Sequence, residues 1–133
     1  MGILIDSNVL IDAERGLVDF SLKVNGREEE QLFLSAITAS ELLHGVWRAK
    51  DSGIRARRSA FVEGILERLP IIAIDLAVAR THAQLWAALA AKGAPIGPHD
   101  LWLAATCVAH GHALVTRNLD EFKRVPGLKV EAW

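Results

Sequence analysis

Short apolar runs alternate along this chain with longer stretches that have helical spacing. The apolar runs have the length of buried strands, which predicts strands at 2–6, 31–37, 71–74 and 112–116 and an edge strand at 128–133. The stretches between them carry apolar residues near the helical period or helix start and stop signals, which predicts helices at 7–16, 17–26, 38–49, 54–69, 75–93, 97–111 and 118–125.

This order of elements predicts the fold class. Strands that are separated by helices pair side by side in one direction, so we expect an α/β domain with a mostly parallel sheet of four or five strands. Helices would cover both faces of the sheet, giving three α/β/α layers. The 133 residues are predicted to form a single domain, 1–133. In such sheets, ligands bind beyond the carboxyl ends of the strands, so catalytic and metal-binding residues are expected there.

Composition narrows the class of protein further. Hydrophobic residues make up 51% of the chain and charged residues 23%, which indicates a globular protein rather than a disordered one. Cys107 is the single cysteine, so no intrachain disulfide can form, as suits a reducing compartment. Asp6 interrupts the first apolar run too early for a signal peptide, and no apolar stretch approaches about 18 residues. We therefore predict a soluble cytoplasmic protein without a membrane segment.

Charge is balanced overall but uneven along the chain. The formal net charge is −1, so bulk charge does not indicate a polyanionic partner. The stretch WRAKDSGIRARR nevertheless holds five basic residues against Asp51 alone, leaving ten basic and fifteen acidic residues elsewhere. Such a stretch either binds phosphates or another acidic partner, or simply forms solvated helix ends; the sequence leaves both interpretations open.

Oxygen-bearing side chains gather where the predicted strands end. Asp6 ends the first strand, Glu41 follows closely after the second, and Asp100 opens the buried helix that leads to the fourth. The fourth strand is followed directly by three more such residues: Thr116, Asn118 and Asp120. Because the carboxyl ends of parallel strands share one edge of a sheet, we expect these segments to converge.

Each of these residues also has a purely structural explanation. Asp6 is a preferred N-cap, Thr38–Glu41 matches a capping box, Asp100 complements a helix dipole, and Asn118 with Glu121 is a second capping pattern. Their joint occurrence favours function, because several carboxylates at one edge repel one another unless a cation binds. Hard oxygen ligands suit Mg²⁺, or Mn²⁺ as a substitute, and a metal of this kind activates water for hydrolysis.

Three segments in this order resemble a known family. ILIDSNVLI, ITASELLHGVWRA and HDLWLAATCVAHGHALVTRNLDEFKRVPGLKVEAW look like a PIN-domain endoribonuclease, and specifically like a VapC-type toxin of a type II toxin–antitoxin pair. The resemblance covers nearly the whole chain. It implies a PIN-like α/β/α fold, Mg²⁺-dependent cleavage of single-stranded regions of RNA, and inhibition by a cognate VapB-like antitoxin.

The resemblance also assigns residues to the site. Asp6, Glu41 and Asp100 match the three acidic positions of the family. Many PIN domains have a fourth acid after the fourth strand, where this chain has Asn118, with Asp120 two residues on; either one is expected to complete the site. We expect one Mg²⁺ held by Asp6 and Asp100, with Glu41 positioning or deprotonating the attacking water.

Neighbouring residues are expected to support this chemistry. Ser7 and Thr116 carry hydroxyls that would orient the carboxylates, and Arg117 is the candidate contact for an RNA phosphate. The basic stretch is a further candidate for RNA phosphates or for an acidic segment of the antitoxin. Apolar helix surface beyond the needs of one small core indicates a homodimer, or a groove for an antitoxin helix, within a larger toxin–antitoxin assembly.

Two other functions fit parts of the sequence. A haloacid dehalogenase-like phosphatase also begins with a strand ending on Asp, but its acid two residues later is Asn8 here, which cannot donate and recover a proton. A non-catalytic module that binds protein or nucleic acid would use the same acids only as helix caps. Stabilisation by Mn²⁺ or Mg²⁺ distinguishes an enzyme site from such a module.

Overall fold

A computed structural model describes residues 2–133 and contains the expected parallel sheet. Within this range, five strands pair in the order β3-β2-β1-β4-β5, and every neighbouring pair is parallel. The strands are β1 (Gly2–Ile5), β2 (Gln31–Ser35), β3 (Ile71–Ile72), β4 (Ala113–Val115) and β5 (Val130–Glu131). The predicted α/β class and the edge position of the last strand are confirmed.

The helices follow the predicted order, with shifted ends. They are α1 (Ser7–Glu14), α2 (Phe20–Lys23), α3 (Ala36–Arg48), α4 (Ser52–Arg68), α5 (Leu76–Ala91), α6 (Pro98–His110) and α7 (Leu119–Phe122). The prediction placed the second strand at 31–37 and the next helix at 38–49. Instead, the Ser35 hydroxyl accepts a hydrogen bond from the Thr38 amide at 3.2 Å, so β2 ends there and α3 begins two residues earlier than predicted.

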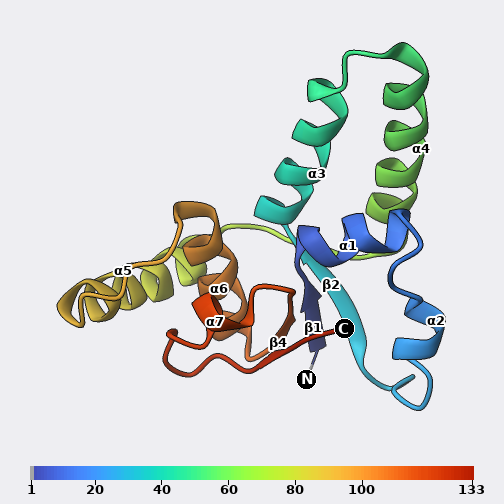
Figure 1. The fold of residues 1–133 in the computed structure, drawn as a ribbon. Coiled ribbons are helices and arrows are strands. Elements are labelled where there is room, and N and C mark those ends of the chain that lie inside the picture. Colours follow the sequence, from blue (N-terminus) through green and yellow to red (C-terminus); the bar gives the residue numbers. More distant parts are fainter. Residues whose placement is uncertain (1) are drawn as a thin grey trace.

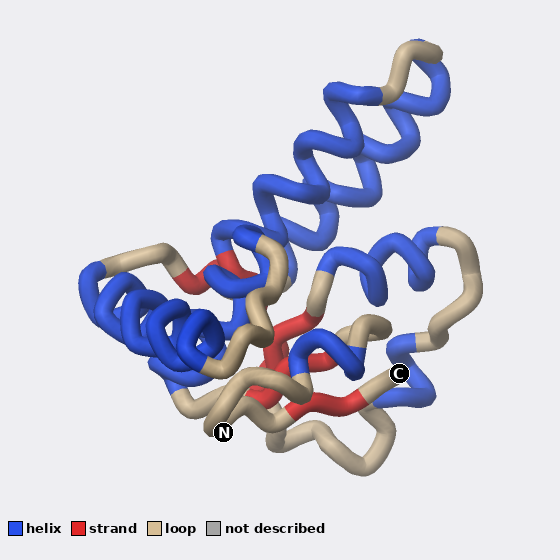
Figure 2. The backbone as a smooth tube through the Cα atoms, turned by 60° about the vertical axis from the view of Figure 1, so that its left-hand side comes forward, coloured by secondary structure: helices blue, strands red, loops and turns tan. Residues whose placement is uncertain are grey.

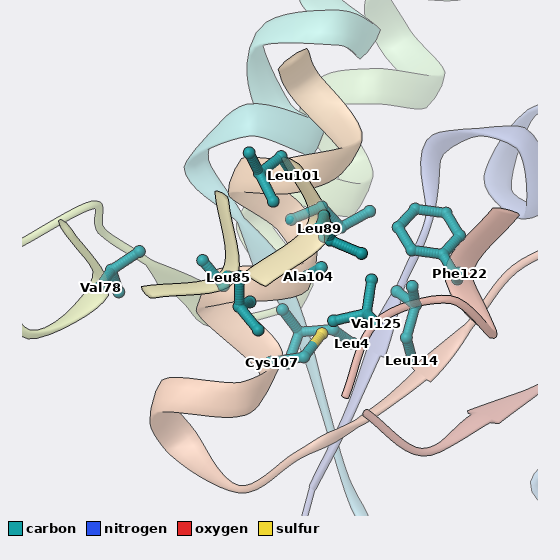
Figure 3. Close-up of a cluster of buried hydrophobic side chains, with 12 residues drawn as sticks. Leu4, Val78, Leu85, Leu89, Leu101, Ala104, Cys107, Leu114, Phe122 and Val125 are labelled. Carbon is teal, nitrogen blue, oxygen red and sulfur yellow. The ribbon is translucent and has the colours of Figure 1, made fainter. Parts of the chain in front are cut away.

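Side chains of the central strands alternate between the two faces of the sheet. Leu4 and Leu114 pack with α5, α6 and α7 in one hydrophobic cluster, part of which is drawn in Figure 3. Ile3, Ile5 and Val115 pack on the opposite face with α1, α3 and α4. The sheet therefore has helices on both sides, as predicted. The α3–α4 hairpin extends well beyond the sheet, and α1 lies across its base (Figures 1 and 2).

The topology places the switch point of the sheet, where open α/β sheets have their ligand crevice, between β1 and β4. From β1 the chain adds β2 and β3 on one side, then crosses over to add β4 and β5 on the other, as the sheet order shows. The carboxyl ends of β1 and β4 therefore lie at the point where the direction of winding reverses, which is where open α/β sheets bind ligands. The Asp6 amide donates to the Val115 carbonyl at 2.9 Å, joining the two segments there.

Candidate active site

Asp6 begins α1 without capping it through its side chain. The residue is 4% exposed, and its carboxylate makes no cap hydrogen bond to the helix. Instead, the Thr116 hydroxyl donates to Asp6 Oδ2 at 2.8 Å, and the Ser7 hydroxyl lies 3.4 Å from Oδ1. Burial raises the pKa of Asp6, and these two hydroxyls oppose that rise. The capping explanation is therefore wrong for this carboxylate.

The hydroxyl of Thr116 is aimed at Asp6 by its other neighbours. The Asn118 amide donates to Thr116 Oγ1 at 3.0 Å, and Asn8 Nδ2 lies 3.5 Å from the same atom. The Arg117 amide donates to Asn8 Oδ1 at 3.2 Å, which sets the orientation of the Asn8 carboxamide. Because the hydroxyl accepts from these groups, its single proton is directed to the Asp6 carboxylate.

Glu41 lies in the second turn of α3. The predicted capping box over Thr38–Glu41 is wrong, because Ser35 caps this helix instead. The Glu41 side chain is 31% exposed, and Oε2 lies 3.8 Å from His99 Nδ1. Burial and repulsion from Asp6 raise the pKa of Glu41. Glu41 and Asp6 therefore come from different strand ends but share one electrostatic environment.

Asp100 is the third residue of α6 and is the most strongly perturbed of these acids. Burial raises its pKa to about 7, with additional repulsion from Asp6, Glu121 and Glu41. Four carboxylates from four separate segments thus act on one another around the end of β1. The sequence predicted three of them, and Glu121 is the residue that it missed.

Glu121 holds together the segments before α6 and after β4. Its Oε1 accepts from the Gly97 amide at 2.8 Å, and its Oε2 accepts from Asn118 Nδ2 at 2.6 Å. The hydrogen bond from Gly97 is the main reason that the pKa of Glu121 is lowered. Asn118 therefore donates to Glu121 rather than capping α7 with its side chain. Asp120 is exposed to solvent, and the structure does not bring it into this group.

The sequence signal for Glu121 is its spacing from Asn118, which the sequence presents as a local cap. The N-cap of α6 is Gly97, which has no side chain to cap the helix. Glu121 accepts from the amide of Gly97 itself, so it fixes the residue before α6 rather than the first turn of the helix.

Arg117 lies at the rim of the site but is already paired. Its Nη1 donates to both carboxylate oxygens of Asp12, at 2.7 and 2.8 Å, while the Arg117 side chain is 63% exposed. Two residues of the basic stretch also have partners: Arg55 donates to the Ala49 carbonyl at the end of α3, and Arg58 donates to the Gly45 carbonyl. Part of the basic stretch is thus explained by satisfying helix carbonyls.

The donor set fits a hard divalent cation. Among residues 2–133, no three His, Cys, Asp or Glu side chains lie close enough to hold an ion between them. Mg²⁺ is commonly bound through one or two carboxylates and keeps several waters, so a closed cage is not required. The mutual repulsion that raises the pKa values of Glu41 and Asp100 is relieved when a cation binds. Asp6 and Asp100 are therefore suitable ligands.

Comparison with known proteins identifies the family. A family model described as the PIN domain matches residues 3–128. The chain belongs to the PIN-domain family. This PIN domain is 34% identical to Ribonuclease VapC1 of Rickettsia felis over 98% of the chain and 95% of that protein. It is 39% identical to the tRNA(fMet)-specific endonuclease VapC of Salmonella typhimurium over 77% of the chain and 76% of that protein.

Solved structures agree with this assignment. The PIN domain superposes on DNA-bound VapBC from Salmonella typhimurium with a TM-score of 0.89 and 31% identity, covering 100% of this chain and 98% of the other. VapBC2 from Rickettsia felis, bound to a DNA fragment from its promoter, also gives 0.89, with 28% identity and coverage of 100% and 99%. The predicted family and fold are confirmed. In the described residues, no helix has the length and apolar character needed to cross a membrane.

Proposed function

We propose that this chain is the toxin of a type II toxin–antitoxin pair: a divalent-metal-dependent endoribonuclease that hydrolyses phosphodiester bonds in single-stranded regions of RNA. Its membership of the VapC ribonucleases supports this function. The observation that carries it is the convergence of Asp6, Glu41, Asp100 and Glu121 at the β1–β4 crevice. Repulsion among these carboxylates is unfavourable for the folded chain without a cation, which supports a functional reason for their convergence.

The proposed roles follow from the contacts of each residue. Asp6 and Asp100 would hold the cation, which when bound supplies Lewis-acid activation of water and offsets negative charge on the phosphoryl oxygens. Mg²⁺ is the proposed ion, with Mn²⁺ as a substitute. Glu41 has a raised pKa and carries no short ion pair, so it is suited to position the attacking water and take its proton.

Supporting roles are assigned to the residues that touch these carboxylates. Thr116 holds Asp6 through a 2.8 Å hydrogen bond, and Ser7 flanks the other oxygen. Asn118 completes the site indirectly, by donating to Glu121. We therefore propose Glu121, in place of Asp120, as the fourth carboxylate. Arg117 is retained as a phosphate contact through the nitrogens that Asp12 leaves available.

Partners are proposed from the relatives. Solved structures that this chain resembles include DNA-bound VapBC2 from Rickettsia felis and DNA-bound VapBC from Salmonella typhimurium. We propose that a VapB-like antitoxin neutralises this chain in the cytoplasm, within a larger assembly built on a toxin homodimer. Exposed apolar residues on α5, Trp86 and Leu76, provide surface for one of these contacts.

Cleavage by the purified chain tests the proposed function. We expect single-stranded oligoribonucleotides to be cut when Mg²⁺ or Mn²⁺ is present and to stay intact in chelator, because Asp6 and Asp100 need the cation to act. Mapping of RNA 5′ ends after expression with and without the antitoxin gene gives the target. A non-catalytic binding module would show neither cleavage nor a metal-linked rise in unfolding temperature, and that pair of results would refute the proposal.

Glu121→Gln is expected to lower cleavage by about 10-fold to 100-fold, whereas Asp120→Asn leaves it within about twofold. The physical reason is that the Glu121 carboxylate accepts from Gly97 and acts on Asp100, while Asp120 is exposed. Steady-state cleavage at saturating Mn²⁺ measures the difference. The two variants remove the same charge one residue apart, so equal effects would contradict the assignment of Glu121.

A further inference from the structure

A groove lies next to the carboxylates and is lined by three arginines. It has a volume of about 120 Å³ and lies between α1, α3 and α4, with Glu41 in its wall. The arginines are Arg15 at the end of α1, Arg48 at the end of α3, and Arg58 in α4. Arg48 and Arg58 belong to the basic stretch, and the fold brings the distant Arg15 to the same surface.

The spacing along α3 joins this groove to the site. Glu41, Gly45 and Arg48 follow one another at intervals of four and three residues, so they lie along one face of the helix. Glu41 stands at the end near Asp6, and Arg48 stands about two turns away. Gly45 between them has no side chain, and a Cβ placed there would meet nothing within 4 Å. The wall between the site and Arg48 is therefore open.

The charges of the groove indicate which kind of ligand it can bind. The catalytic carboxylates repel a polyanion, and Arg117 at their rim is paired with Asp12. Arg15 and Arg48 are exposed, and in the described part of the chain neither takes part in a salt bridge or side-chain hydrogen bond. Arg58 is half-buried and reaches the Gly45 carbonyl at 3.4 Å. These guanidinium groups supply positive charge beside the anionic site, and Glu14, which also lines the groove, offsets only part of it.

We propose that this groove binds the backbone phosphates of the RNA strand on one side of the bond that is cut, with Arg15 and Arg48 as direct contacts and Arg58 as a supporting charge. The inference rests on the proposed nuclease function and says where the RNA strand lies beyond the bond that is cut. An RNA strand that places a phosphate at Glu41 and Asp6 must leave the site, and the α3 face leads it past cations. An acidic protein segment would match the same charges, but the substrate has to lie in the site to be cut, and its strand continues from there.

Salt-dependent binding of RNA tests the proposal directly. The full chain carrying Asp100→Asn, which is expected to bind RNA without cutting it, is titrated into a labelled single-stranded oligoribonucleotide at several salt concentrations. Arg15→Gln and Arg48→Gln are each expected to weaken binding about fivefold at 0.1 M salt and to reduce the log–log salt slope by about 0.7, the value for one phosphate contact on a single strand. Arg48→Lys should restore most of the slope, because it keeps the charge.

Arg57→Gln is the matched control, since Arg57 is exposed in α4 next to Arg58 but does not line the groove. Affinities and slopes for Arg15→Gln and Arg48→Gln that equal those of Arg57→Gln would overturn the proposal. Loss of binding to an oligo-glutamate peptide by these two variants, with RNA binding unchanged, would overturn it as well. Cleavage by the otherwise unmodified chain is measured in parallel. If the unmodified chain does not cleave RNA but both variants bind RNA more weakly, the nuclease function is refuted and the groove is supported as an RNA-binding site.

Discussion

Asp100→Asn is expected to reduce RNA cleavage by about 1,000-fold while making the metal-free protein more stable above pH 7. A bound cation contributes several kcal/mol to transition-state stabilisation, and each 1.4 kcal/mol corresponds to about tenfold in rate. The stability gain has a separate cause. Asp100 is half-buried among Asp6, Glu41 and Glu121, and its charge is unfavourable there until a cation binds.

Asp6→Ala separates the loss of cleavage from the gain in stability. It should reduce RNA cleavage as strongly as Asp100→Asn does. It should not stabilise the protein, because it leaves the buried Thr116 hydroxyl without its acceptor. Loss of such a partner costs about 1–3 kcal/mol. Oligoribonucleotide cleavage in Mn²⁺ and thermal unfolding in chelator measure both quantities, with Asp120→Asn as the control. Cleavage retained in both variants, or an Asp100→Asn protein that unfolds at lower temperature, would contradict these roles for the two carboxylates.

The stability of the metal-free protein is expected to depend on pH through Asp100. Its pKa is about 7 in the folded chain and 3.8 in an unperturbed aspartate, so between these values the folded state holds a proton that the unfolded state has released. Raising the pH through this window therefore favours unfolding, and the contribution is constant below about 4 and above about 7. Asp6 and Glu41 have raised pKa values and act in the same direction.

Thermal unfolding of the unmodified chain and Asp100→Asn at pH 5, 6, 7 and 8 measures this effect. His82 and His112 have pKa values lowered by burial and act in the opposite direction, so the difference between the two proteins is the informative quantity. The advantage of Asp100→Asn should grow from pH 5 to 7. Mn²⁺ at a fixed concentration should stabilise the unmodified chain more at pH 8 than at pH 5; at 100 times its dissociation constant the total stabilisation is about 2.7 kcal/mol. A difference that is independent of pH would refute the assignment of this linkage to Asp100.

Sequence patterns predicted the architecture because each element satisfies its own local rules. Apolar runs of strand length became β1 and β4, and Gly111, with φ of 68°, ends α6 at the residue where the predicted helix stops. The alternation of strands and helices predicted parallel pairing, and every neighbouring pair in the sheet is parallel. What local rules could not set was the ends of elements. Ala36 and Ile37 were assigned to the second strand, although they form the start of α3, which the Ser35 hydroxyl caps.

The site was only partly predictable, because some of its residues are selected by contacts between segments that are distant in sequence. Asp6 and Asp100 were expected at the crevice from their positions relative to the strands, and the structure places them around it with Glu41. The choice between Asp120 and Glu121 depends on which one faces Gly97, a contact across 24 residues that no local pattern encodes. The pairing of Arg117 with Asp12, separated by 105 residues, is likewise a property of the folded chain.

The central position of β1 has a consequence for the order of synthesis. Asp6 leaves the ribosome early, but Thr116, which holds it, is 110 residues further along, and Glu121 follows still later. A nascent chain therefore cannot assemble its carboxylates until β4 has been translated and has paired with β1. Every translation product that stops before this point lacks the site. A cell that makes this nuclease is thus protected from it until translation of the chain is nearly finished.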